Sequence, residues 1–256
     1  MTEEFPEELP GKAKCPWNEN LFKVDMRSPK LNKSKSETFH TFVAKALFLS
    51  NRARPDIQPA VSMLSTRVRE PTENDWNKLV RMMDFLKRTK DDVLKLYADD
   101  FETIRWYVDA AFAVHQDYNS HTGSTMTLGK GAAISSSTKH KVNTRSSTES
   151  ELVGLDDTVS KILWTKYFLE SQGFKPKMNI VYGDNQSTMK MEQNGKQSCG
   201  KRTRHFNIKY FYVTDLIERG EIQIKYCPSE NMIGDYMTKP LLGAKFEEFR
   251  KAVMNL

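Results

Sequence analysis

Four carboxylates in the second half of the chain have the residue type and the placement for metal-ion chemistry. One interrupts the predicted strand 106–113, one lies in the first turn of a predicted helix, one ends the predicted strand 179–184, and one follows the last predicted strand. In chain order they are Asp109, Glu151, Asp184 and Asp235. Sites in open α/β sheets gather at strand ends, and clustered oxygen ligands suit Mg²⁺. Two such ions about 4 Å apart can activate a water and stabilise the leaving oxygen of a phosphodiester.

Asp109 gives the strongest of these signals. The stretch from Trp106 to Ala113 is rich in the β-branched and aromatic residues that favour strands. An aspartate there is disfavoured by propensity and, if buried, by desolvation, and clustered carboxylates repel one another without a cation. The alternatives are that Asp109 faces water at a sheet edge and that Asp184 caps the helix after it. Asp235 has the least support from pattern.

Two glutamates compete for the helical position. Glu151 can close a capping box with Thr148, and Glu149 can do the same with Ser146. Helical register favours Glu151 as the ligand, because it shares a face with apolar residues turned toward the sheet, whereas Glu149 leads to polar positions. The apolar face consists of Leu155, Val159 and Ile162.

The elements that must position these side chains follow from periodicity. Helical spacing predicts three early helices: about 36–50, from Pro55 to Pro71, and one opened by a Thr72–Asp75 cap. Strands are then expected at 106–113, 125–128, 132–137, 179–184 and 222–226, turns at 120–123 and 129–131, and helices at 148–172, 185–193, 205–219 and around Asp235. This order predicts an α/β fold, a mixed five-stranded sheet flanked by helices, with the first strand central.

Composition bounds the class of protein. The chain has 256 residues, 38% of them hydrophobic and 28% charged, which is polar for a globular protein but well short of a disordered one. No apolar run approaches the ~18 residues of a membrane span, and the acidic N-terminus is no secretory signal, so an intracellular protein, cytoplasmic or nuclear, is expected. The three cysteines are too few and too far apart for a zinc cluster or a disulfide framework. A net charge of +6 suits a polyanionic partner.

Three ranges are expected along the chain. Residues 1–33 form an irregular lead-in, 34–100 a small helical segment, and 101–256 the α/β domain. Between the last two lies Tyr97-Ala-Asp-Asp100, which resembles the metal-binding turn of reverse transcriptases. A polymerase needs that turn in a strand-rich palm, and the preceding residues read as helices. The acidic pair is therefore interpreted as a solvated turn, with a polymerase fragment as the lesser alternative.

Six motifs in order carry a resemblance to a known family. They are Tyr107-Val-Asp-Ala, Ser120-His-Thr-Gly, Ser146-Ser-Thr-Glu-Ser-Glu-Leu, Tyr182-Gly-Asp-Asn-Gln-Ser, Lys201-Arg-Thr-Arg-His-Phe-Asn-Ile and Asp235-Tyr-Met-Thr-Lys-Pro-Leu. Together they resemble the ribonuclease H domain of copia-type LTR retrotransposon polyproteins. Arg54-Pro-Asp-Ile and Phe85-Leu-Lys-Arg-Thr resemble the helical segment that joins polymerase to ribonuclease H in those polyproteins.

The resemblance implies a fold, a reaction and a site. The fold is ribonuclease H-like, and the reaction is hydrolysis of the RNA strand of an RNA–DNA hybrid. The four carboxylates would hold two Mg²⁺ ions, with Mn²⁺ able to substitute, and His205 would contact substrate beside them or serve only as a loop residue. The palm, integrase and protease of such a polyprotein are absent from these residues, so a truncated, processed or domesticated piece is expected, and other polyprotein parts are candidate partners.

Basic residues in two predicted loops are candidates for gripping nucleic-acid phosphates. One set precedes the Glu151 helix and the other precedes His205. They are Lys139, Lys141 and Arg145, and Lys201, Arg202 and Arg204. Any one of them could instead be an ordinary solvated charge. The main alternative to the enzyme is a catalytically inactive nucleic-acid-binding remnant, and the sequence leaves the oligomeric state open.

Overall fold

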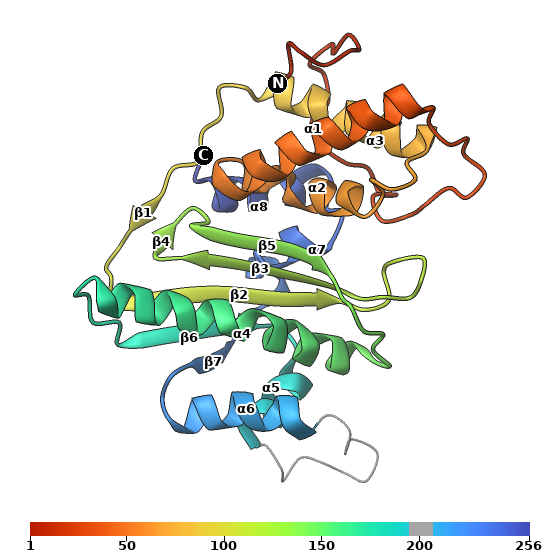
Figure 1. The fold of residues 1–256 in the computed structure, drawn as a ribbon. Coiled ribbons are helices and arrows are strands. Elements are labelled where there is room, and N and C mark those ends of the chain that lie inside the picture. The colour runs from red at the N-terminus through yellow and green to blue at the C-terminus, as the bar shows by residue number, and fades with distance from the viewer. Residues whose placement is uncertain (195–206) are drawn as a thin grey trace. The chain divides into compact units, whose positions relative to one another are not determined.

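The structure is a computed structural model of the chain and describes residues 1–194 and 207–256. Its contacts divide into two compact units (Figure 1). Unit 1 combines Met1–Lys95 with Lys239–Leu256, and unit 2 is Leu96–Thr238. The three ranges expected from sequence differ from this division, since residues 239–256 lie with the N-terminal residues and not with the sheet. No helix of the described residues is both long and apolar enough to cross a membrane.

Unit 2 is built on the five-stranded mixed sheet that the sequence predicts. Its strands are β2 (Thr103–Ala111), β3 (His121–Thr127), β5 (Ile134–Lys139), β6 (Met178–Gly183) and β7 (Gln223–Tyr226). The order across the sheet is β5-β3-β2-β6-β7, so the first strand is central as expected. The β2–β3 and β3–β5 pairs are antiparallel, and the β2–β6 and β6–β7 pairs are parallel.

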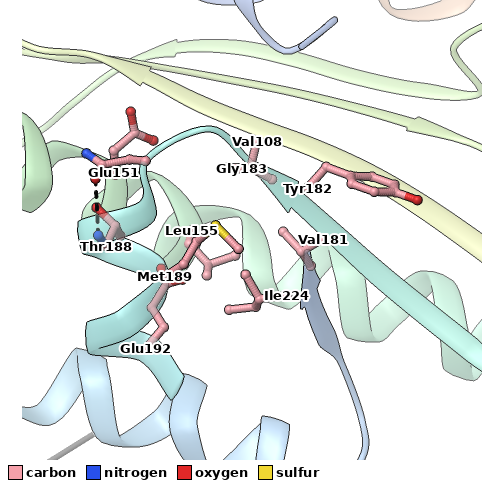
Figure 2. Close-up of a pocket in the computed structure, with 11 residues that line it drawn as sticks. Val108, Glu151, Leu155, Val181, Tyr182, Gly183, Thr188, Met189, Glu192 and Ile224 are labelled. Carbon is pink, nitrogen blue, oxygen red and sulfur yellow. Dashed lines mark hydrogen bonds between the residues drawn. The ribbon is translucent and has the colours of Figure 1, made fainter. Parts of the chain in front are cut away.

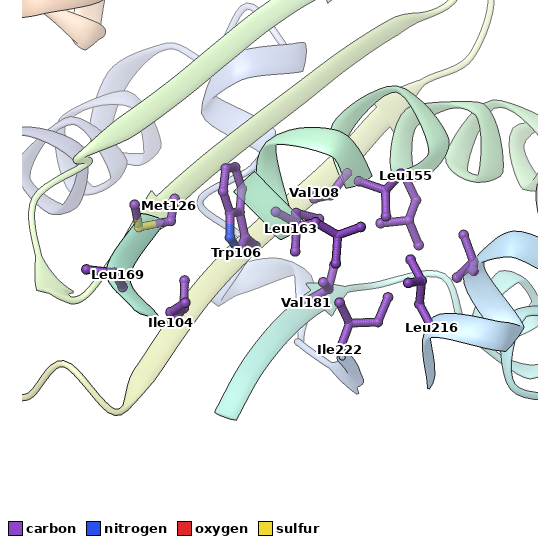
Figure 3. Close-up of a cluster of buried hydrophobic side chains, with 13 residues drawn as sticks. Ile104, Trp106, Val108, Met126, Leu155, Leu163, Leu169, Val181, Leu216 and Ile222 are labelled. Atoms are coloured by element: carbon purple, nitrogen blue, oxygen red, sulfur yellow. The ribbon is translucent and has the colours of Figure 1, made fainter. Parts of the chain in front are cut away.

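Successive side chains of each strand point to opposite faces of this sheet, and helices cover the face that carries the apolar ones. Trp106 and Val108 of β2 point into the apolar core, whereas Tyr107 and Asp109 point to the opposite face. Helix α4 (Ser147–Ser171) packs along the core face, and α5 (Gln186–Asn194) and α6 (Asn207–Glu218) follow β6 (Figure 1). The core unites strands and helices (Figure 3); its members include Ile104, Trp106, Leu155, Ile162, Val181 and Leu216.

The predicted turn at 120–123 is wrong. His121 begins β3, and the strand continues through Thr127 with every residue buried. Its Gly123 pairs with Asp109 and lies against α7 (Asp235–Thr238), where an added Cβ would stand 2.6 Å from Met237 Cβ. A glycine there serves close packing of a helix on a strand, which turn composition does not reveal.

Short elements complete unit 2. The Tyr97–Ala98 strand β1 pairs with β4 (Gly129–Lys130), the predicted turn before β5. The acidic pair after Tyr97 is exposed, and Asp100 Oδ1 accepts hydrogen bonds from the backbone N–H groups of Glu102 and Thr103 at 2.8 and 2.7 Å. The expected solvated turn is therefore confirmed.

Unit 1 contains the expected early helices. They are α1 (Lys33–Arg52), η1 (Pro55–Ile57), α2 (Gln58–Ser65) and α3 (Glu73–Arg88). The predicted capping box is present, since Thr72 Oγ1 accepts from Asp75 N and an Asp75 oxygen accepts from Thr72 N. Helix α2 ends at Ser65, earlier than Pro71 suggested. Residues 1–33 are irregular as expected, yet Phe5 and Trp17 are buried.

The final helix belongs to unit 1 through a buried ion network. The predicted helical stretch at Asp235 is interrupted after Thr238, and α8 (Gly243–Met254) follows separately. Arg250 of α8 donates from Nε to Asp56 Oδ2 at 2.9 Å, and Arg54 donates to the other oxygen of Asp56 at 2.8 Å. Asp56 is fully buried between the two guanidinium groups, which compensate the cost of burying its charge.

Candidate metal centre

Three of the four predicted carboxylates meet in unit 2. Asp109 on β2, Glu151 on α4 and Asp184 just after β6 each offer an oxygen, and these oxygens lie within 4.8 Å of one another. Asp109 is 2% exposed, while the other two are half-buried. Like charges at this separation repel strongly, and a hard cation bound by their oxygens would remove that repulsion. The donor set therefore fits a divalent metal such as Mg²⁺.

Two stacked tyrosines set the spacing of the two aspartates. Tyr107 and Tyr182 are the last residue pair of the parallel β2–β6 ladder, and their rings stack with centroids 4.9 Å apart and planes at 22°. Asp109 and Asp184 each come two residues later, on the strand side that the tyrosines share. The tyrosine stack therefore joins the strands at the point just before the carboxylates, a role that sequence reasoning missed.

Asp184 is not used as a helix cap. Asn185 takes that role, because its Oδ1 accepts hydrogen bonds from Ser187 N and Thr188 N, both at 3.1 Å. Asp184 Oδ2 instead accepts a hydrogen bond from Ser229 Oγ at 3.0 Å. The capping alternative for this aspartate is thus filled by its neighbour, and Asp184 remains in the acidic group.

The two glutamates of α4 have separate positions. Glu149 belongs to the cap of the helix: Ser146 is the N-cap and its Oγ accepts from Glu149 N at 3.1 Å, while Glu149 Oε2 accepts from Arg145 N at 2.6 Å. Glu151, two residues on, reaches the acidic group. Helical register distinguishes them, because residues two apart point in different directions around the helix.

Asp235 stands apart from the three-carboxylate group. It is buried at the start of α7, and α7 reaches Asp109 by other atoms. Thr238 Oγ1 donates a hydrogen bond to Asp109 Oδ2, and an added Cβ on Gly234 would lie 3.3 Å from Asp109 Cβ. The threonine is a positioning contact for Asp109 that the sequence analysis did not identify. Its position in the motif that begins at Asp235 was the available signal.

A small pocket of about 30 Å³ opens beside Glu151 (Figure 2). Its walls are mostly apolar, from Val108, Leu155, Val181 and Ile224. Glu192 of α5 also lines it, and burial raises the pKa of this carboxyl to about 8. Glu192 is therefore neutral at pH 7 in the folded protein, so it adds no further negative charge near the acidic group.

The predicted phosphate-binding residues are placed unevenly. Lys141 and Arg145 are exposed in the loop before α4, whereas Lys139 ends β5 and forms a salt bridge to Asp117. Lys139 is therefore already partnered, while Lys141 and Arg145 are the more accessible cations. The remaining predicted residues, which are Lys201, Arg202, Arg204 and His205, lie outside the described residues.

A chain of hydrogen bonds runs from α7 through Ser137 of β5 to His121, the first residue of β3. Ser137 Oγ donates to Met237 O at 2.7 Å, so the contact of 2.7 Å to His121 Nε2 assigns the proton to the histidine. His121 Nδ1 then accepts from His115 Nε2 at 2.9 Å. Burial lowers the pKa of His115 to about 4 and that of His121 well below its usual value, so both rings are neutral at pH 7.

The chain is similar in sequence to polyproteins of plant transposons. A retrovirus-related Pol polyprotein from transposon TNT 1-94 of Nicotiana tabacum is 26% identical over 216 residues, which cover 84% of this chain and 16% of that protein. The Pol polyprotein from transposon RE2 of Arabidopsis thaliana is 28% identical over 202 residues, 78% of this chain and 14% of that protein. No family model matches the chain, and no solved structure does.

The homologues of this chain are thus retrovirus-related Pol polyproteins of copia-type transposons, which confirms the resemblance of its motifs to polyproteins of that kind. A putative transposon Ty5-1 protein of Saccharomyces cerevisiae is 32% identical over 126 residues, 48% of this chain and 41% of that protein. The chain spans about a sixth or less of the plant polyproteins it matches.

Proposed function

We propose that the chain is the ribonuclease H part of a retrotransposon polyprotein, with the ribonuclease H-like fold expected over residues 101–256 built on unit 2 and a polymerase-connection-like segment over residues 34–100 in unit 1. The observation that supports this most is the group of three carboxylates that β2, α4 and the end of β6 bring together beside a mixed five-stranded sheet. Relatives that are Pol polyproteins of transposons support the same conclusion. The proposed reaction is hydrolysis of the RNA strand of an RNA–DNA hybrid.

Each residue of the site has a role in this proposal. Asp109, Glu151 and Asp184 would hold the metal, with Asp235 of α7 joining them when the site is loaded. Two Mg²⁺ ions, or Mn²⁺ in their place, would supply activation of the attacking water and stabilisation of the leaving oxygen. Thr238 Oγ1 donates a hydrogen bond to Asp109 Oδ2 and so helps to orient that carboxylate.

The substrate contacts come from outside the acidic group. Lys141 and Arg145, with the cations of the 201–204 loop, would bind phosphates of the hybrid, and His205 would lie beside the scissile bond. The ribose 2′-hydroxyl would mark the strand to cut, because it is what distinguishes RNA from DNA at a given site. A cytoplasmic or nuclear location and association with other polyprotein parts belong to the same proposal.

Cleavage of a labelled hybrid by the purified chain tests this function. Cleavage of the RNA strand that requires Mg²⁺ and stops on addition of a chelator is the expected result. Binding of the hybrid without cleavage, in Mg²⁺ and in Mn²⁺, would instead establish the inactive nucleic-acid-binding remnant. The position of Asp235 outside the 4.8 Å group is the observation that favours this second function. Primer extension tests the polymerase interpretation of the Tyr97 turn, and no extension is expected.

A further inference from the structure

Unit 1 contains a second pocket, of about 240 Å³, that the proposed function does not use. It lies between the segment 16–21, α2 and α3. Leu21, Ala60 and Leu64 give it an apolar floor. The polar lining residues are two cations and four amides: Lys78, Arg81, Asn18, Asn20, Asn74 and Asn77. None of its lining residues is acidic.

One wall of the pocket is a stripe along α3. Asn74, Asn77, Lys78 and Arg81 occupy positions i, i+3, i+4 and i+7, which places all four on one face of the helix. The opposite stripe of α3 is apolar and packs into the core of unit 1. The polar face, on which Asn77 and Arg81 are exposed, therefore borders a cavity whose apolar floor is buried.

The two cations of the stripe bind only backbone oxygens. Arg81 Nε donates to Trp17 O at 3.0 Å, and Lys78 Nζ donates to Leu21 O at 3.1 Å. Among the described residues neither cation forms a salt bridge, and the terminal nitrogens of Arg81 have no partner. The neighbouring carboxylate of Asp75 is engaged by Arg67 at 3.2 Å.

Two positive charges line a cavity that has no acidic lining residue, and Asp75, the carboxylate that acts on Lys78, lies outside the lining, so the lining favours an anionic occupant. Burial lowers the pKa of Lys78, which an anion bound beside it would oppose. A guanidinium with free terminal nitrogens is suited to a phosphate, which it can bind through two parallel hydrogen bonds. The charge of the pocket therefore points to a phosphate-bearing ligand.

The amides indicate what the phosphate is attached to. The side chains of Asn74, half-buried, and Asn77, exposed, form no hydrogen bond to another side chain or backbone group of the described residues, so each can offer its donors and its acceptor to a ligand. Paired donors and acceptors match the edge of a nucleobase, whereas inorganic phosphate offers no such edge. The volume is below the ~300 Å³ at which pockets for drug-sized ligands begin, so one nucleotide is the fitting size.

We propose that this pocket binds a single unpaired nucleotide, free or within a nucleic-acid strand, with its phosphate at Arg81 and its base edge at Asn74 and Asn77. Binding at this site is independent of the metal centre of unit 2. It should therefore persist in a chelator and in an Asp109→Asn variant, so its failure and the failure of the ribonuclease H proposal are distinguishable.

Calorimetric titration of the full chain in chelator tests the ligand class. The probes are adenosine, cytidine, guanosine and uridine 5′-monophosphates, a single-stranded tetranucleotide, adenosine and inorganic phosphate. At least one mononucleotide should bind at least ten times more tightly than adenosine and phosphate. Tighter binding of the tetranucleotide would place the site on a strand, and equal binding would make it a mononucleotide site. Equal affinity for phosphate and nucleotides, or no binding of any nucleotide, would overturn the proposal.

Substitutions then locate the site. Asn77→Asp conserves shape and adds a negative charge to the pocket wall, so nucleotide affinity should fall at least tenfold. Asn143→Asp, at an exposed asparagine of unit 2, is the matched control and should leave affinity within twofold. Arg81→Gln should also weaken binding at least tenfold, while Arg69→Gln, at an exposed arginine outside the pocket, should not.

Melting curves of each variant guard against a loss of binding through unfolding. Arg81→Gln removes the bond to Trp17 O and can lower stability, whereas Asn77→Asp breaks no hydrogen bond of the described residues. A folded Asn77→Asp protein that binds nucleotide like the parent would overturn the proposal. Equal losses in Arg69→Gln and Arg81→Gln would do so as well, because they would show attraction by net charge alone.

Discussion

Two polar clusters in unit 2 differ in whether their charges are compensated. Around His121 each hydrogen bond of the chain joins a donor to an acceptor, and both histidines are neutral, so the chain of hydrogen bonds is self-sufficient. Around Asp109 three carboxylates of one sign converge within 4.8 Å. The first arrangement stabilises the fold as it stands, whereas the second is complete only with a cation. Substitutions in the two clusters should therefore have opposite effects on stability and on activity.

The largest expected effect is on activity at the acidic group. Asp109→Asn should abolish Mg²⁺-dependent cleavage of the hybrid, because an amide cannot supply the charge that holds the ions. Its melting temperature in chelator should hold or rise, since one charge of a repulsive set is removed. Cleavage assays and melting curves check both parts. A variant that still cuts hybrids, or that melts several degrees lower without metal, would contradict the assignment.

The two glutamates of α4 allow a metal ligand to be compared with a capping residue within a single helix turn. Glu151→Gln should remove most of the cleavage activity and leave stability nearly unchanged. Glu149→Gln should keep activity within a few-fold, since a glutamine oxygen can still accept the hydrogen bond from Arg145 N. Cleavage rates of both variants, measured beside their melting temperatures, provide the test. Equal losses of activity would show that helical register does not select the ligand.

Breaking the histidine chain should affect stability and its pH dependence. Ser137→Ala would leave the Nε2 proton of His121 without its acceptor, at a cost of about 1–3 kcal/mol in the free energy of unfolding. In the parent, burial lowers the folded-state pKa values of His115 and His121 below the 6.5 of an unfolded histidine. The stability that depends on both rings being neutral is therefore fully present above pH 6.5 and is lost as the pH falls toward 4.

Urea unfolding at pH values from 7 to 4.5 measures this effect. The parent should lose stability progressively below pH 6.5, and His115→Gln should lose less over the same range because one buried histidine no longer has to be protonated. Superimposable pH profiles for the parent and His115→Gln would show that the buried ring does not govern acid stability.

The smallest effect is expected at the turn after Tyr97. Asp99→Asn with Asp100→Asn should leave hybrid cleavage within a few-fold and stability within about 0.5 kcal/mol, as for surface substitutions away from special features. The amide oxygen that the second substitution introduces can still accept the two turn hydrogen bonds now made by Asp100. Loss of cleavage with the fold intact would move the metal site to this turn.

Local patterns predicted those parts of the fold that local physics determines. The Thr72–Asp75 capping box and the central strand with Asp109 are set by residues close in sequence, and both are present. The start of β3 at His121 was missed because Ser120-His-Thr-Gly has the composition of a turn. Its burial comes from strands and a helix distant in sequence.

The candidate site shows the same limit. Register along α4 distinguished Glu151 from Glu149, since a helix repeats within four residues. The hydrogen bond from Thr238 to Asp109 and the stacking of Tyr107 on Tyr182 join segments far apart in the chain. Local sequence does not measure such distances, so the motif that contains Thr238 could mark the residue but not the carboxylate that it contacts.

The return of residues 239–256 to unit 1 has a consequence for synthesis on the ribosome. Unit 1 is discontinuous, with all of unit 2 inserted between its two parts. Arg250, which neutralises the buried Asp56, emerges after the whole sheet has been made. Because domains fold as they emerge, the sheet can form first, while the N-terminal helices hold Asp56 paired with Arg54 alone and lack the second guanidinium and the packing of α8. A nascent chain stalled before residue 239 should therefore protect unit 2 from protease and leave the first 95 residues open to cleavage.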